Sequence, residues 1–163
     1  MNIKRKSQGG FTLVELLVVI AIIGVLATLL LLQLGVARQR ARDAKRIADI
    51  NQVRTAVELY FDDNGQYPQV ATYAALGALF VPRYLTLMPA DPLATGNYAY
   101  RYAYNITTRF QLWAELEQNA RAALGADADI NSTGWTGEVG TGATETCASG
   151  TVVDCVYDQG QSQ

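Results

Sequence analysis

The chain has 163 residues, half of them hydrophobic, with 13 Lys and Arg against 15 Asp and Glu and no His. One modest globular domain and an anchor fit this length, because a domain typically takes about 100–200 residues. A sequence without histidine excludes histidine-activated nucleophiles and the common histidine-containing zinc sites. The negative net charge argues against a general nucleic-acid binder. We therefore expect a protein that is not an enzyme and binds no nucleic acid by default.

Residues 1–10 form a polar leader with three basic residues, no acid and a Gly9-Gly10 end. Without it, ten basic residues would face 15 acidic ones, a net charge near −5. An ordinary secretory signal instead has about 7–15 apolar residues and then a small-residue cleavage site. Gly35-Val36-Ala37 offers such a site, but the apolar stretch before it is too long, so we disfavour this alternative.

Residues 11–34 form a run of 24 residues in which Glu15 is the only charged one. As a helix the run would reach about 36 Å, more than a hydrocarbon core of about 30 Å, which predicts a transmembrane helix. A carboxylate in such a span costs about 2.5–3.5 kcal/mol at mid-helix and less near the headgroups. Glu15 should therefore have a partner; the alternative is an unpaired carboxylate near the membrane surface.

Residues 35–63 predict an amphipathic continuation of this helix, with Gly65 as its C-terminal cap and Pro68 preventing its extension. Asp49 and Val53 break the apolar pattern, so part of the helix could face water or a neighbouring subunit. The face expected to pack on the globular domain carries apolar residues at three- and four-residue steps: Ala37, Ala41, Ala44, Ile47, Ala48, Ile50, Val57, Tyr60 and Phe61.

A basic cluster follows the apolar run, with Asp43 as the only acid within it. Two interpretations are about equal: a helix surface facing water or headgroups, and ion pairs with acids of a neighbouring subunit. Binding of DNA is a less favoured third. The cluster consists of Arg38, Arg40, Arg42, Lys45 and Arg46.

Residues 64–163 should form the globular head, beginning with a short helix over residues 72–79. Tyrosines alternate with other residues over 97–104, and apolar residues alternate over 110–116, which predicts an antiparallel hairpin. The predicted fold class is α+β, with a long N-terminal helix packed on a small antiparallel sheet. After residue 117 the sequence is rich in turn-forming residues, and its core candidates are Trp135 and Val152-Val153.

The strongest motif is Gly9-Gly10-Phe11-Thr12-Leu13-Val14-Glu15-Leu16 followed by the hydrophobic helix. It resembles the processing signal of the prepilin family, which includes type IV pilins and type II secretion pseudopilins. The resemblance is specific over residues 4–36 and looser over residues 60–68. It implies a type IV pilin-like fold, cleavage after Gly10 by a prepilin peptidase, and methylation of the new amino group of Phe11. The alternative is an anchor with an uncleaved basic stub.

The resemblance also implies that Glu15 pairs with the Phe11 amine of an adjacent subunit in a homo-oligomeric filament. An assembly ATPase and a platform protein would be further partners. The precursor would lie in the inner or cytoplasmic membrane with its N-terminus inside, and the filament would be periplasmic or extracellular. Leu32 stands where many pilins have proline, so Gly24 and Gly35 serve either helix loosening or close helix packing.

Cys147 and Cys155 lie close together in a domain expected to be exported, where oxidation is the default, so we predict a disulfide. Two free thiols are the alternative. Asp127 and Asp129 resemble part of the calcium loop of the major pseudopilin, and an ordinary acidic turn is the favoured interpretation. Calcium is thus the one cofactor considered, and none is the default.

Three functions follow from these observations. The first is a structural subunit of a type IV pilus-like filament. The second is a pseudopilin of a type II secretion system. The third, from another class, is a membrane-tethered binding domain that never polymerises, for which the sequence shows no convergent polar groups.

Overall fold

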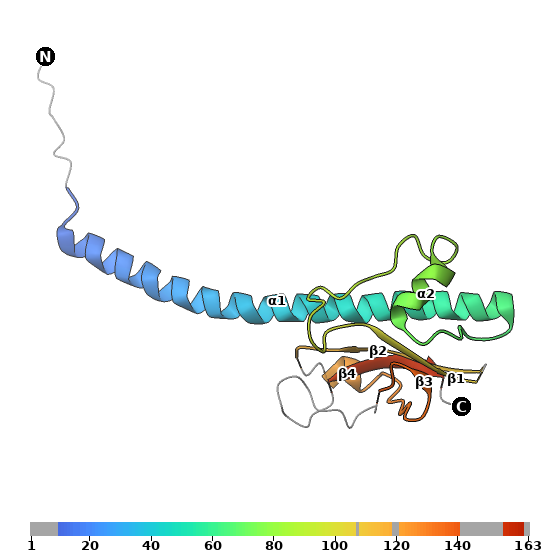
Figure 1. Ribbon diagram of the computed structural model, residues 1–163. Helices are drawn as coiled ribbons and strands as arrows, with labels where there is room; N and C mark the ends of the chain where they lie inside the picture. The colour runs from blue at the N-terminus through green and yellow to red at the C-terminus, as the bar shows by residue number, and fades with distance from the viewer. Residues whose placement is uncertain (1–9, 107, 119–120, 141–154, 162–163) are drawn as a thin grey trace, which may run out of the picture. The chain divides into compact units, whose positions relative to one another are not determined.

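The computed structural model describes residues 10–106, 108–118, 121–140 and 155–161. The chain divides into two compact units, residues 1–38 and residues 39–163. Its elements, shown in Figure 1, are α1 (Leu13–Asn64), α2 (Tyr73–Phe80), β1 (Arg101–Asn105), β2 (Arg109–Glu115), α3 (Arg121–Leu124), β3 (Thr136–Gly137) and β4 (Val156–Gln161).

Helix α1 is continuous over 52 residues. It ends where predicted: Gly65 adopts a φ of +71°, and its N–H donates to the Phe61 carbonyl at 2.7 Å. Its N-terminal part is apolar and long enough to cross a membrane by length and composition, with a mean hydropathy of 2.9. Helix α2 also begins as predicted, because the Thr72 side chain caps it by accepting from the Ala75 N–H.

The four strands form one antiparallel sheet in the order β3-β1-β2-β4. The predicted hairpin is confirmed, with Tyr104 opposite Phe110. Its first strand was predicted too long, because residues before Arg101 form turns in which the N–H groups of Tyr98 and Ala99 donate to nearby carbonyls. The predicted α+β class and pilin-like architecture are confirmed.

One face of the sheet lies against α1 (Figure 1), and side chains of this face, α1 and α2 form the main core. Tyr102, Phe110 and Leu112 are fully buried on this face. The Phe110 ring lies 4.6 Å from the Tyr67 ring, centroid to centroid. The tyrosines of the predicted alternation thus face the core from Tyr100 onward.

The opposite face is buried too, which the alternation of residues 110–116 did not predict. Gln111 and Trp113, both on β2, are 0% and 2% exposed. The chain after α3 covers them: Trp113 Nε1 donates to the Glu138 carbonyl at 2.9 Å, and Gln111 Nε2 to the Ile130 carbonyl at 2.7 Å. Of the predicted later core, Trp135 is only half-buried, and Val152-Val153 lie outside the described residues.

Candidate processing and assembly site

The first turn of α1 is closed by three hydrogen bonds between Thr12 and Glu15, which run in both directions. The Thr12 N–H donates to Glu15 Oε2 at 2.7 Å, and the Thr12 hydroxyl accepts from the Glu15 N–H at 3.2 Å and donates to Oε2 at 2.8 Å. This arrangement is a capping box, for which Thr-x-x-Glu at a helix start is the sequence signature. The signature Thr12-Leu13-Val14-Glu15 is present in the sequence and is sufficient to predict this cap.

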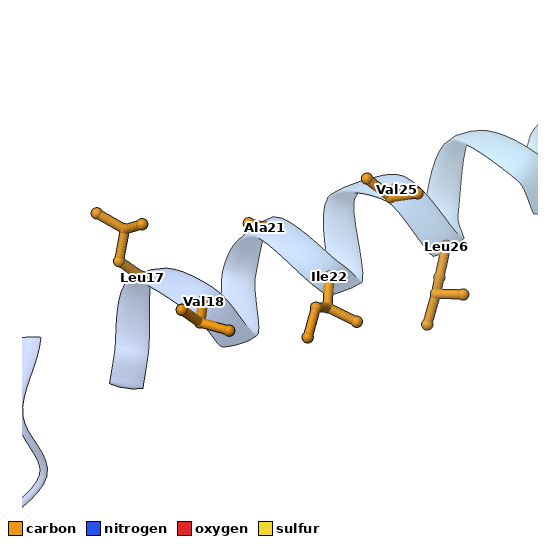
Figure 2. Close-up of a pocket in the computed structure, with 6 residues that line it drawn as sticks. All are labelled: Leu17, Val18, Ala21, Ile22, Val25 and Leu26. Atoms are coloured by element: carbon orange, nitrogen blue, oxygen red, sulfur yellow. The ribbon is translucent and has the colours of Figure 1, made fainter. Parts of the chain in front are cut away.

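The helix that follows is apolar on all sides. The side chains of residues 13–31 are exposed, and Phe11 just before the helix is 88% exposed. A helix of this kind is stable in lipid or in a bundle of helices rather than in water. Figure 2 shows a shallow groove in which Ala21 lies between longer side chains; its lining is Leu17, Val18, Ala21, Ile22, Val25 and Leu26.

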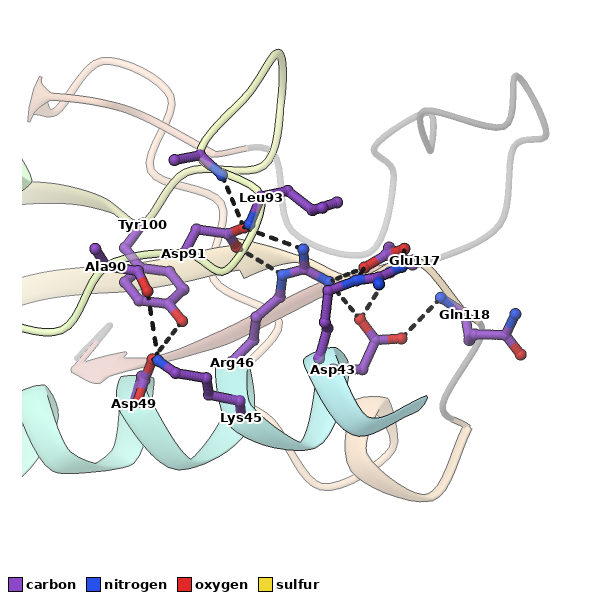
Figure 3. Close-up of polar contacts among 12 residues, drawn as sticks. Asp43, Lys45, Arg46, Asp49, Ala90, Asp91, Leu93, Tyr100, Glu117 and Gln118 are labelled. Atoms are coloured by element: carbon purple, nitrogen blue, oxygen red, sulfur yellow. Dashed lines mark hydrogen bonds and ion pairs between the residues drawn. The ribbon is translucent and has the colours of Figure 1, made fainter. Parts of the chain in front are cut away.

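In the second unit, α1 holds the head through a buried arginine. The Arg46 side chain is 0% exposed and contacts three carboxylates (Figure 3). Its Nε donates to Asp91 at 2.6 Å, and its Nη1 donates to Asp43 at 2.7 Å and to Glu117 at 2.8 Å. Glu117 also accepts two bonds from Arg42. Arg46 therefore connects α1 to the loop before β1 and to the segment after β2.

Two of the carboxylates around Arg46 also accept hydrogen bonds from backbone N–H groups. Asp91 accepts from the Leu93 N–H at 2.8 Å, and Asp43 accepts from the N–H groups of Glu117 and Gln118 at 2.9 and 3.0 Å. Burial raises the pKa of Asp91, but the bonds from Arg46 and the two backbone N–H groups outweigh it and lower the pKa overall. Asp91 is therefore held ionised beside the arginine.

The predicted packing face of α1 is partly wrong. Ala41, Ala44 and Ala48 are exposed, whereas Asp43 and Asp49 are buried with Arg46. The polar residues are turned inward because each finds partners in the head. Asp49, for example, accepts from the Tyr100 hydroxyl at 2.6 Å and pairs with Lys45.

Both interpretations of the basic cluster are wrong for Arg46, which is buried and pairs with acids of its own chain. Arg42 and Lys45 also pair with acids of their own chain but keep part of their side chains exposed. Arg38 and Arg40 are exposed, so for them both interpretations stay open.

The sequence of this chain is similar to those of known proteins. A family model described as a prokaryotic N-terminal methylation motif matches residues 5–31. The type II secretion system core protein G of Pseudomonas aeruginosa is 32% identical over 79% of this chain and 97% of that protein. The corresponding protein of Klebsiella michiganensis is 35% identical over 55% of this chain and 70% of its own length.

The type IV wide pilus major component PilA4 of Thermus thermophilus is 42% identical over 50% of this chain and 63% of that protein. No solved structure matches the chain. The chain belongs to the type IV pilin and type II secretion pseudopilin family. For a pilin-like chain, the apolar half of α1 and the capped turn around Glu15 are the candidate assembly site.

The remaining predicted residues lie elsewhere in this pilin-like chain. Cys155 is buried, and Cys147 lies outside the described residues, so the disulfide stays a prediction. Asp129 is exposed with a φ of +47°, and Asp127 Oδ2 accepts from the Asp158 N–H at 3.4 Å. Over the described ranges, no three acidic, Cys or His side chains are grouped to bind a metal.

Proposed function

We propose that this chain is the precursor of a structural subunit of a type IV pilus-like filament. The proposal rests on the N-terminal half of α1, which is apolar and exposed and whose first turn is capped by Glu15, in a chain of the pilin family. The leader is removed between Gly10 and Phe11, and the amine of Phe11 is methylated. The apolar halves of α1 then leave the membrane and pack together.

Glu15 orients the incoming subunit. Its Oε2 accepts the two bonds from Thr12, and Oε1 accepts none from the described residues. The amine of Phe11 keeps its positive charge when methylated, so a neighbouring subunit can offer it to this carboxylate. Pairing of the two charges removes the cost of holding a carboxylate in an apolar bundle.

The same proposal implies a membrane topology and a set of assembly partners. The leader keeps the N-terminus on the cytoplasmic side of the inner or cytoplasmic membrane, and the head is exported. A prepilin peptidase, an assembly ATPase and a platform protein are the proposed partners, and the role is structural rather than catalytic.

A pseudopilin of a type II secretion system is the second candidate. It is favoured by relatives named type II secretion system core protein G, one of which is matched over 97% of its length. Deletion of the gene separates the two: loss of surface filaments supports the pilus, and retention of normally secreted proteins in the periplasm supports the pseudopilin.

Replacing Glu15 tests the polymerisation itself. We expect Glu15→Leu to be cleaved and to remain in the membrane, but to be absent from sheared or overproduced filaments. Val14→Leu, a neighbouring change that keeps the glutamate, is the control and should assemble normally. Filaments of Glu15→Leu at the wild-type amount would contradict the proposed pairing.

A further inference from the structure

A buried carboxylate on β4 lies under the turn that follows α3. Asp158 is 1% exposed. Its Oδ2 accepts from the Ile130 N–H and from Gln111 Nε2, both at 2.8 Å, and its Oδ1 accepts from the Ala128 N–H at 3.1 Å. One side chain therefore joins the turn to β2 and to β4.

The main chain of Asp158 takes part in the same contact. Its carbonyl accepts from the Ala128 N–H at 3.3 Å, and its N–H donates to the side chain of Asp127. The turn and β4 lie very close together here: a Cβ atom on Gly160 would lie 2.8 Å from Ile130 Cδ1. Residues 127–130 are thus wrapped around one position of β4.

The polarity of this arrangement is opposite to that of a calcium site. Calcium takes 6–8 oxygen ligands, which must converge on one point. Here the turn directs N–H groups inward onto a carboxylate, and the Ile130 carbonyl already accepts from Gln111. The side chain of Asp129 is exposed, and only its backbone N–H is directed at Asp158. Over the described residues, no three acidic side chains are grouped as calcium ligands would be, so the residues that resemble a calcium loop do not converge on one point.

We propose that Asp158 holds the turn of residues 127–130 on the sheet, which is the structural role of the bound ion in a calcium loop. The head of this chain therefore needs no calcium. The carboxylate of Asp158 supplies the acceptor for the buried Ile130 N–H and a second acceptor for the Ala128 N–H. The inference concerns the folded head, so it stands whether or not the chain polymerises.

Thermal unfolding of the full chain in detergent micelles tests this proposal. We expect the Tm of the wild type to agree within about 1 °C in EDTA and in excess CaCl₂, because a ligand that does not bind cannot shift it. Asp158→Ala should lower the Tm by roughly 5–10 °C in both solutions, because it leaves the buried Ile130 N–H unpaired and removes a bond from Gln111 and one from Ala128. Asp129→Asn, which changes the exposed neighbouring carboxylate, is the matched control and should melt with the wild type.

Calcium binding would give a different pattern. A wild-type Tm that rises by several degrees with calcium would overturn the proposal, and loss of that rise in Asp129→Asn would identify Asp129 as a ligand.

Hydrogen exchange measured by mass spectrometry keeps the test valid if Asp158→Ala fails to fold. The variant Asp158→Asn keeps the side-chain shape and offers a single acceptor oxygen. A peptide that spans residues 126–131 should exchange faster in this variant, while peptides from residues 50–57 of α1 stay protected. Unchanged protection of residues 126–131 would overturn the proposed role of Asp158.

Discussion

Arg46 shows how one side chain can decide which face of a helix is buried. It lies in a basic cluster that reads as a solvated surface, yet its guanidinium contacts three carboxylates, and the Tyr98 ring lies 4.7 Å from it. Burial lowers the pKa of Arg46, but the bonds to Asp91, Glu117 and Asp43 raise it overall. The charge of the arginine is therefore retained inside the head.

Removal of this arginine should be costly. Arg46→Ala leaves buried carboxylates without their counter-charge, which typically destabilises a protein by about 3–5 kcal/mol. Denaturant unfolding of the full chain in micelles, followed by tryptophan fluorescence, measures the change. Arg40→Ala removes an exposed arginine of the same helix and should stay within about 0.5 kcal/mol of the wild type. An Arg46→Ala chain as stable as Arg40→Ala would contradict this account.

At the scale of the elements, sequence patterns correctly predicted the helix ends and the hairpin, because neighbouring residues determine these features. Gly65 and Thr72 mark the end of α1 and the start of α2, and the alternating residues on both sides of the hairpin set its pairing. The packing face of α1 was not predictable in the same way. Arg46 is buried because of Asp91 and Glu117, which lie 45 and 71 residues further along the chain.

The sequence did not locate strand β4, for a related reason. Its residues, Val-Tyr-Asp-Gln-Gly-Gln, lack the apolar alternation of a half-buried strand, and its polar residues find partners on other elements. Gln159 accepts from Arg54 of α1 at 2.7 Å, while Asp158 on the opposite face binds the turn after α3. Single-sequence patterns do not show such pairings.

Gly160 is the position in β4 where this packing is tightest. A Cβ atom there would lie 2.1 Å from the Phe110 carbonyl oxygen, so Gly160→Ala must displace β4 from β2. We expect a loss of roughly 2–4 kcal/mol in unfolding free energy, comparable with other overpacked sites. The control is Gly77→Ala in α2, whose added methyl meets only the flexible Met88 side chain at 3.2 Å. Equal stability of the two variants would contradict the assigned pairing.

At the scale of the whole chain, the two compact units differ in which side chains they bury. The buried core and the ion pairs around Arg46 belong to residues 39–163. The apolar part of α1 lies in the other unit and exposes its side chains. Residues 39–163 therefore have stabilising contacts of their own, which the proposed exchange of lipid for neighbouring helices would leave intact. A subunit that moves from a membrane into a filament requires this independence.

The intact mass of the chain, taken from membranes or sheared filaments of cells with an active prepilin peptidase, tests the central claim most directly. We predict a chain that begins at Phe11 and carries one added methyl group. It should also be lighter by two hydrogen atoms before reduction, if Cys147 and Cys155 are joined. A mass that retains residues 1–10 would contradict the filament-subunit account and favour a simple membrane anchor.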